Sequence, residues 1–220
     1  METGRQRAGY KERMRDMALR QIRTLGDEVL TKKCREVKEM TPRLRTLAAD
    51  MLETMYHAEG VGLAAPQVGV LRRIVVIDVG EGPVTLVNPV VVEKDGEQTG
   101  SEGCLSVPGK AGQVTRPEHV IVKALDLDMK EITVEGRDLF ARALCHEIDH
   151  LDGVMYISKV EGELYSTQPQ EEDEEDEDED VGGSYGNRRI FCRRAYPAAS
   201  GRIHGNTGFR IRDSGGTDSV

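Results

Sequence analysis

The stretch with the clearest chemical potential is CHEIDHLDG, residues 145–153, in which His146 and His150 lie four positions apart and Glu147 follows the first histidine. Residues four apart on an α-helix project to the same side, so two imidazoles on adjacent turns can hold one metal ion. Glu147 lies about 100° around the helix from His146, where its carboxylate can accept a proton from water at the metal. The residue types and their spacing therefore predict a metal site with acid–base chemistry rather than a structural pair of histidines.

A catalytic site of this kind needs three protein ligands and one open position, so a third ligand must come from elsewhere in the chain. The downstream candidates are poor, because Glu161 and Glu163 precede a highly acidic run and His204 lies in a segment without hydrophobic periodicity. Upstream, Cys104 lies in TGSEGCLSVPG, residues 99–109, whose glycines predict a tight segment that exposes the thiol. Cys104 is the better candidate, and a buried cysteine without a role is the ordinary alternative.

Hydrophobic patterns predict the elements that must position these residues. Residues 41–60 have apolar side chains at helical spacing, with Thr41 as N-cap, Pro42 at the first helical position and Gly60 at the end. Residues 136–153 repeat the helical pattern and carry both histidines on one broad face. β-Branched or alternating segments predict strands at 72–80 and 83–94 and a hairpin at 119–136. Two helices and several strands without strict alternation indicate an α+β fold.

Composition and charge limit the class of protein. The 220-residue chain is 38% hydrophobic and 31% charged. No apolar run approaches the roughly 20 residues that span a bilayer, so we expect no membrane contact. The first residues lack the apolar core of a secretory signal, and the four scattered cysteines are not typical of a disulfide framework. The net charge of −9 is dominated by the acidic run 171–180, and the body of the chain before it is mildly acidic and offers no evident basic footprint. We therefore expect no direct DNA binding.

The end of the chain has a different composition from its body. The acidic run 171–180 cannot bury apolar surface and repels itself, which is typical of a solvated, disordered segment. Residues 181–220 are rich in glycine, serine and arginine and have no sustained hydrophobic period. We expect one catalytic domain at residues 17–164 and a disordered tail at residues 165–220.

Three segments together resemble the three motifs of the peptide deformylase family, in the family's order and at similar separations: GVGLAAPQVG at 60–69, EGCLS at 102–106 and HEIDH at 146–150. The resemblance covers essentially the whole expected domain. It implies antiparallel sheets packed around a central metal-binding helix. It also implies a hydrolase of protein biosynthesis that removes the formyl group from the N-terminal formyl-methionine of nascent polypeptides and releases formate.

The resemblance also implies roles for individual residues. Cys104, His146 and His150 would hold one divalent metal ion, with iron(II) as the usual ion and zinc, nickel or cobalt as others that fit. Glu147 would act as general acid and base during co-translational processing. The Gln67 side chain and the backbone N–H of Leu105 would stabilise the oxyanion. The remaining expectations concern substrate binding, by the backbone of Gly62 and by a methionine pocket formed by Val61, Leu139 and Ala143, for which a plain core role is an equal alternative.

The sequence departs from the family pattern at three places. Cys145 stands where the family usually has glutamine, and its helical angle places it away from the metal. Residues 1–16 precede the usual start of the family chain, so we expect a flexible N-terminal extension. Some relatives contact the ribosome through a basic C-terminal helix, whereas the acidic run 171–180 here would repel RNA phosphates. We expect a bacterial-type cytoplasmic enzyme with a transient ribosome contact of undefined surface.

Two other readings of the metal site compete with this one. A zincin-type endopeptidase would take its third ligand downstream of His150 rather than from Cys104. A structural metal module would close the site with four protein ligands and would not need Glu147.

Overall fold

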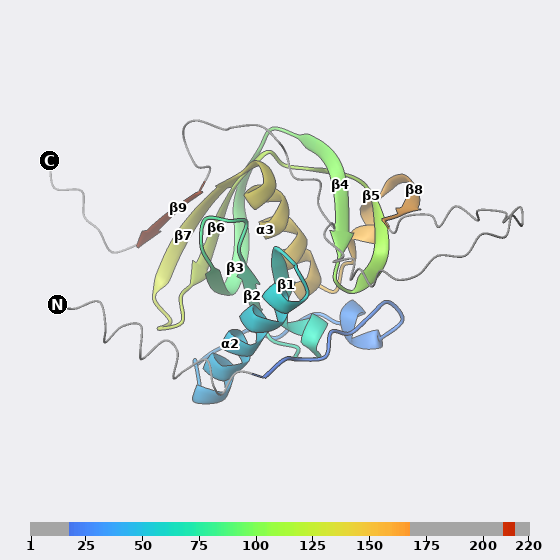
Figure 1. Ribbon diagram of the computed structural model, residues 1–220. Helices are drawn as coiled ribbons and strands as arrows, with labels where there is room; N and C mark the ends of the chain where they lie inside the picture. Colours follow the sequence, from blue (N-terminus) through green and yellow to red (C-terminus); the bar gives the residue numbers. More distant parts are fainter. Residues whose placement is uncertain (1–17, 168–208, 214–220) are drawn as a thin grey trace, which may run out of the picture.

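The computed structural model describes residues 18–167 and 209–213, which form two antiparallel sheets on either side of one central helix (Figure 1). The six-stranded sheet has the order β1-β2-β3-β6-β7-β9, and the three-stranded sheet has the order β4-β5-β8. The strands of the first sheet are β1 (Gly62–Ala64), β2 (Ile74–Ile77), β3 (Val84–Asp95), β6 (His119–Leu125), β7 (Glu131–Arg137) and β9 (Phe209–Asp213). Those of the second are β4 (Gln98–Cys104), β5 (Val107–Arg116) and β8 (Glu161–Ser166). The expected α+β class is confirmed.

The described residues also form helices α2 (Pro42–His57) and α3 (Asp138–Leu151) and three short 3₁₀ turns, η2 (Glu28–Thr31), η3 (Ala65–Val68) and η4 (Tyr156–Lys159). Thr41 caps α2 as predicted, since its side chain accepts a hydrogen bond from the Leu44 amide at 3.3 Å. The helix ends at His57, earlier than the predicted Gly60, because Glu59 already takes a left-handed backbone conformation with φ 54°. The glycine N–H instead closes the turn on the Met55 carbonyl at 2.9 Å.

Helix α3 is buried on both sides, and its two faces differ in chemistry. Leu144 and Ile148 lie in the apolar cluster beneath the six-stranded sheet. The opposite face carries Arg142 and His146, whose side chains bond to groups on β4 and β5. The predicted side of the helix that carries the histidines is therefore present, and it packs toward the three-stranded sheet. Neither long helix, nor any other helix among the described residues, has the length and apolarity needed to cross a membrane.

Two parts of the sequence fold differently from expectation. Residues 98–116 form the β4–β5 hairpin, which the mixed, glycine-rich sequence did not indicate as strands. The expected disorder from residue 165 onward is wrong for two segments, because β8 continues to Ser166 and residues 209–213 pair with β7 as β9. The alternation in FRIRD is only five residues long, too short to stand out within an arginine- and glycine-rich segment. The expectations for residues 1–16 and 171–180 lie outside the described residues.

Candidate active site

Three metal-ligating side chains from two elements meet between α3 and the end of β4. Cys104 is the last residue of β4, and His146 and His150 lie on successive turns of α3. One ligand atom from each lies within 4.8 Å of the other two, and the Cys104 sulfur is 3.3 Å from Nε2 of His150. A thiolate with two imidazoles is a donor set that first-row divalent metals favour, so these residues fit a metal ion.

A buried carboxylate orients one of the two histidines. Glu102 is 1% exposed, and its Oε2 lies 3.1 Å from Nδ1 of His146, which leaves Nε2 of that imidazole for a metal. Burial alone would raise the pKa of Glu102, but hydrogen bonds from His146 and Arg116 outweigh it and lower the pKa to about 2. Arg142 adds a second guanidinium contact to Glu102, at 2.9 Å. The carboxylate is therefore ionised and accepts the imidazole N–H.

Glu147 lies beside this cluster and against β1. An atom placed at the Cβ position of Gly62 would lie 2.3 Å from Oε1 of Glu147, so only glycine leaves room for the carboxylate. Oε2 of Glu147 is buried and has no hydrogen-bond partner among the described residues. Burial raises the pKa of Glu147 to about 7, although His146 opposes the rise. Such a carboxyl group can both take up and release a proton near neutral pH.

The amide of Gln67 points its donor group toward the same cluster. Its Oε1 accepts a hydrogen bond from the Ala64 amide at 2.8 Å, which fixes the orientation of the side chain. Its Nε2 then lies 3.1 Å from Oγ of Ser106 and 3.5 Å from the Cys104 sulfur. Leu105 follows Cys104 directly and lines the same cavity, so a side-chain amide and a backbone segment flank the cluster.

One cavity of about 170 Å³ brings most of the predicted site residues together. Its lining includes all predicted site residues except His150, namely Val61, Gly62, Gln67, Cys104, Leu105, Leu139, Ala143, His146 and Glu147. Ala143 is buried, whereas Leu139 is 39% exposed and stands at the rim. The sequence left two roles open for Leu139, in the methionine pocket or in the core. Its exposure fits a core role poorly.

The other candidate ligands lie elsewhere. Cys145 is buried in the apolar cluster with Leu144 and Ile148, outside the Cys–His–His group, and burial raises the pKa of its thiol. Glu161 and Glu163, which an endopeptidase-type site would need, are exposed on β8. His204 lies outside the described residues.

The sequence analysis did not include Glu102 among the site residues, and it missed the two arginine partners of this carboxylate. Arg116 ends β5 and Arg142 lies one helical turn before His146, so no local pattern links them to Glu102. A usable signal did exist for Arg142. It occupies the same helical face as the two histidines, and a cation on a buried face requires a buried anion nearby.

The fold and this cavity together define a metal-dependent hydrolase. The family model of polypeptide deformylase matches residues 19–164. The peptide deformylase of Agathobacter rectalis is 66% identical over 149 residues, which are 68% of this chain and 94% of that protein. That of Lachnoclostridium phytofermentans is 58% identical over 159 residues, 71% of this chain and 98% of that protein. The crystal structure of the Thermotoga maritima peptide deformylase aligns with a TM-score of 0.65 at 39% identity, covering 66% of this chain and 99% of that one.

The chain therefore belongs to the polypeptide deformylase family. It is a hydrolase of protein biosynthesis that removes the N-terminal formyl group from nascent polypeptides, as the three sequence motifs indicated.

Proposed function

We propose that Cys104, His146 and His150 hold the metal ion of this deformylase and that Glu147 is its general acid and base. The observation that carries the proposal is the meeting of three ligand atoms within 4.8 Å beside a buried carboxylate. A divalent cation bound there supplies Lewis acidity, which lowers the pKa of water and polarises the formyl carbonyl. We propose iron(II) as the ion in the cell, although zinc, nickel and cobalt suit the same donors.

The surroundings of Glu147 support its role in proton transfer. Its Oε1 occupies the space that a side chain at position 62 would need, and its Oε2 has no hydrogen-bond partner among the described residues. This oxygen is available to take a proton from the attacking water and to deliver it to the departing amine. A carboxyl pKa of about 7 suits both steps at neutral pH.

We assign the stabilisation of the developing oxyanion to Gln67 and to the backbone N–H of Leu105. The Ala64 amide holds Oε1 of Gln67, so the donor end of this amide faces the cluster. Donors that are fixed before the reaction stabilise a developing negative charge without reorganising. Gln67 is 1% exposed, so solvent does not screen it.

Substrate binding follows from the position of β1 at the end of the six-stranded sheet. Among the described strands, β1 pairs only with β2, so its other edge has no partner strand, and Gly62 on this strand lines the cavity. We propose that the backbone of Gly62 pairs with the formylated chain there. Val61, Leu139 and Ala143 line the adjacent cavity and would receive the methionine side chain.

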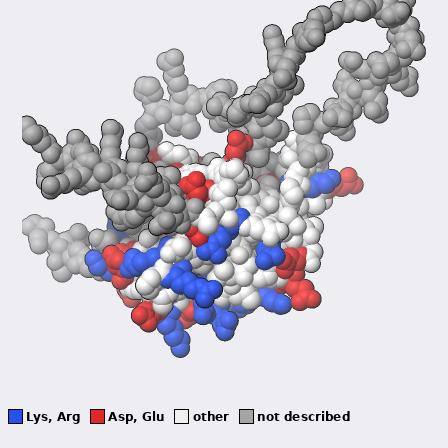
Figure 2. Space-filling view, turned by 60° about the horizontal axis from the view of Figure 1, so that its bottom comes forward, with Lys and Arg blue, Asp and Glu red and all other residues white. Residues whose placement is uncertain are grey.

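We also infer that the enzyme contacts the ribosome transiently, and we place this contact on a basic groove near the start of α2. Lys and Arg side chains gather on that face of the molecule (Figure 2). The groove is lined by both acidic and basic residues. Four of its cations, Arg35, Lys38, Arg43 and Arg72, form no ion pair with another described residue. The sequence did not indicate this concentration of charge, because Glu36 and Glu39 lie among Arg35, Lys38 and Arg43, and Arg72 joins them only in the fold.

Guanidinium and ammonium groups without carboxylate partners suit phosphate oxygens, and such contacts weaken with salt. Ribosome sedimentation with the full chain tests the proposal. The Arg43→Glu, Arg72→Glu double variant should lose binding while it cleaves free peptides normally. Unchanged sedimentation would place the contact elsewhere. Because nascent chains are made at ribosomes, we propose a cytoplasmic location.

The activity itself is tested by formate release from a formyl-methionyl peptide, with the acetylated peptide as control. We expect rapid release from the first and none of the corresponding acetate from the second. Equal cleavage of internal peptide bonds would instead support an endopeptidase.

A further inference from the structure

The six-stranded sheet ends in a strand that the family relationship does not account for. The family model stops at residue 164, whereas β9 consists of residues 209–213 and lies along β7 at the far edge of the sheet (Figure 1). The register has five consecutive antiparallel pairs, from Gly136 opposite Phe209 to Ile132 opposite Asp213. Without β9, the outer N–H and C=O groups of β7 would form an unpaired edge, which is a template for strand addition.

The alternation of the two strands matches across this edge. On β7, Ile132 and Val134 are buried, whereas Glu131 and Glu135 lie on the outer face. Residues directly opposite in an antiparallel pair share a face of the sheet, so Ile211 lies on the same face as Val134, where its side chain remains 43% exposed at the edge of the sheet. A slip of one residue would bring arginine to the core face, which fixes the register.

The charged side chains on β7 favour a neighbouring strand that carries cations. Arg210 stands opposite Glu135, and Arg212 stands opposite Thr133, diagonal to Glu131 and Glu135. Arg210, Ile211 and Arg212 are all exposed, so the register assigns the two arginines to the outer face. Opposite charges on neighbouring strands stabilise a pairing, and like charges oppose it. The same face of β7 also carries Arg137, which contacts Glu135 as His119 does. The two carboxylates against one guanidinium favour a neighbouring strand whose outward residues are basic.

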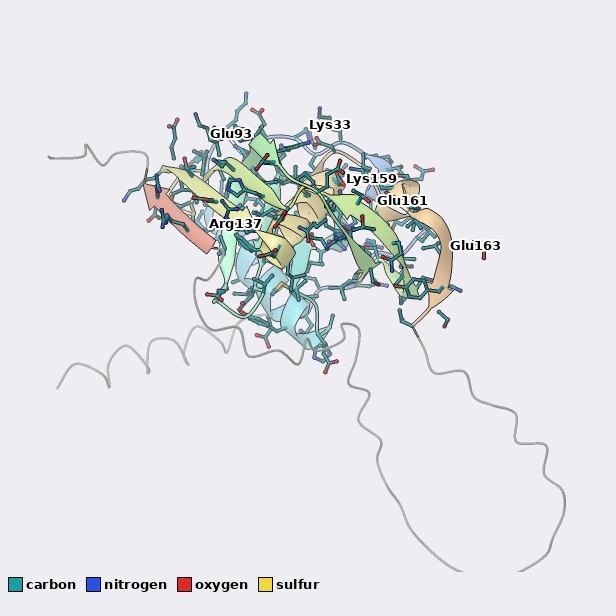
Figure 3. All side chains as sticks on the ribbon, turned by 90° about the horizontal axis from the view of Figure 1, so that it is seen from above. Lys33, Glu93, Arg137, Lys159, Glu161 and Glu163 are labelled. Atoms are coloured by element: carbon teal, nitrogen blue, oxygen red, sulfur yellow. The ribbon has the colours of Figure 1, made fainter. Side chains whose placement is uncertain are left out.

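We propose that the outer edge of β7 is an acceptor site for an extended segment with alternating apolar and cationic residues, and that residues 209–213 of the same chain are its resident occupant. This site is separate from the catalytic cavity. Arg137, the last residue of β7, lies beside β9, while Glu161 and Glu163 on β8 lie at the opposite end of the molecule (Figure 3). Because β7 continues directly into α3, the occupant braces the strand from which the metal-binding helix begins.

Hydrogen exchange in the full chain tests the proposal. Ile211→Pro removes a backbone N–H and disfavours strand pairing, so alternate amides between residues 132 and 136 should exchange at least tenfold faster. Thr217→Pro, a proline in the same tail but outside β9, should leave their exchange unchanged. Formate release should be the same in both variants, which shows that the domain stays folded.

A synthetic peptide of residues 206–216 tests whether the edge accepts a strand. Added to the Ile211→Pro protein, it should restore protection of the β7 amides, and an Arg210→Glu peptide should bind at least several-fold more weakly. Adding Glu135→Arg to the protein should recover part of that loss. Unchanged exchange on Ile211→Pro, or no protection by the peptide, would overturn the acceptor site. Protection in the full chain that falls on dilution would mean that a second copy supplies the strand, and would overturn the assignment to the same chain.

Discussion

Glu102 and His146 form the pair that sets the orientation of the candidate metal site, with Oε2 of the buried carboxylate 3.1 Å from Nδ1 of the imidazole. A carboxylate behind a metal-binding histidine fixes the ring, selects the tautomer and increases the basicity of the nitrogen that faces the metal. Here the carboxylate is also held by two buried guanidinium groups, from Arg116 and Arg142. The orientation and basicity of the His146 imidazole therefore depend on a network of ion pairs that includes Arg116 on β5.

Glu102→Gln tests this dependence. We expect metal affinity to fall about 10–100-fold, because the imidazole loses its anionic partner. The free energy of unfolding should fall by about 3–5 kcal/mol, because the buried Arg142 loses its counter-charge and Arg116 keeps only that of Asp149. Chelator competition measures the first effect and urea unfolding the second. Glu102→Asp, which keeps the charge, should lose less stability. Metal binding by the glutamine variant at the affinity of the unchanged protein would show that Glu102 does not orient the ligand.

Gly62 and Glu147 give a second prediction, because any side chain at position 62 would meet the Glu147 carboxylate. Gly62→Ala should lower kcat for formate release by about 100-fold, as expected for a displacement of about 1 Å at a reacting group. Its metal content should not change, since the ligands are not touched. Gly103→Ala is a matched control in the same cavity, where the added Cβ would meet only the Lys110 carbonyl, at 3.6 Å. Equal activity of the two variants would remove the steric argument.

Two cysteines near the site are expected to behave in opposite ways. Cys104→Ala should abolish stoichiometric metal binding, because the sulfur is one of the three proposed ligands. Cys145→Ala should keep full metal content and formate release and lose only about 1 kcal/mol of stability, because this side chain packs in the core. Elemental analysis of both purified variants decides the matter. A loss of metal in the Cys145 variant alone would reverse the assignment.

The choice of iron(II) predicts sensitivity to oxygen. Iron-loaded protein should lose activity in air through oxidation of the iron or of the Cys104 thiolate, whereas nickel-loaded protein should remain active. The measurement compares formate release by anaerobic and aerobic preparations of each. Equal rates of formate release by the anaerobic and aerobic iron-loaded preparations would contradict the expected oxidation.

The parts of the fold that sequence reasoning predicted are those with a long, regular hydrophobic period. Helix 42–57 has a cap and a full apolar stripe, and β6 and β7 alternate over seven residues each. The β4–β5 hairpin was not predicted, because its strands contain glycines and polar residues that become buried only when α3 packs on them. Tertiary contacts, rather than local propensity, form these strands.

The candidate site divides in the same way. His146, Glu147 and His150 were recognisable because one helix places them at a fixed spacing. Cys104 had a local glycine signal, and its selection relied on family resemblance. The partners of Glu102 are far apart in the sequence, and their role depends on burial, which no local pattern reports.

The most direct test of the central claim is single-turnover formate release by the Glu147→Gln protein, measured together with its metal content. We predict one metal ion per chain, as in the unchanged protein, and a rate of formate release that is about 10²–10⁴-fold lower, because the proton carrier is gone. A glutamine variant that binds metal and still releases formate at the original rate would contradict the assignment of Glu147 as general acid and base.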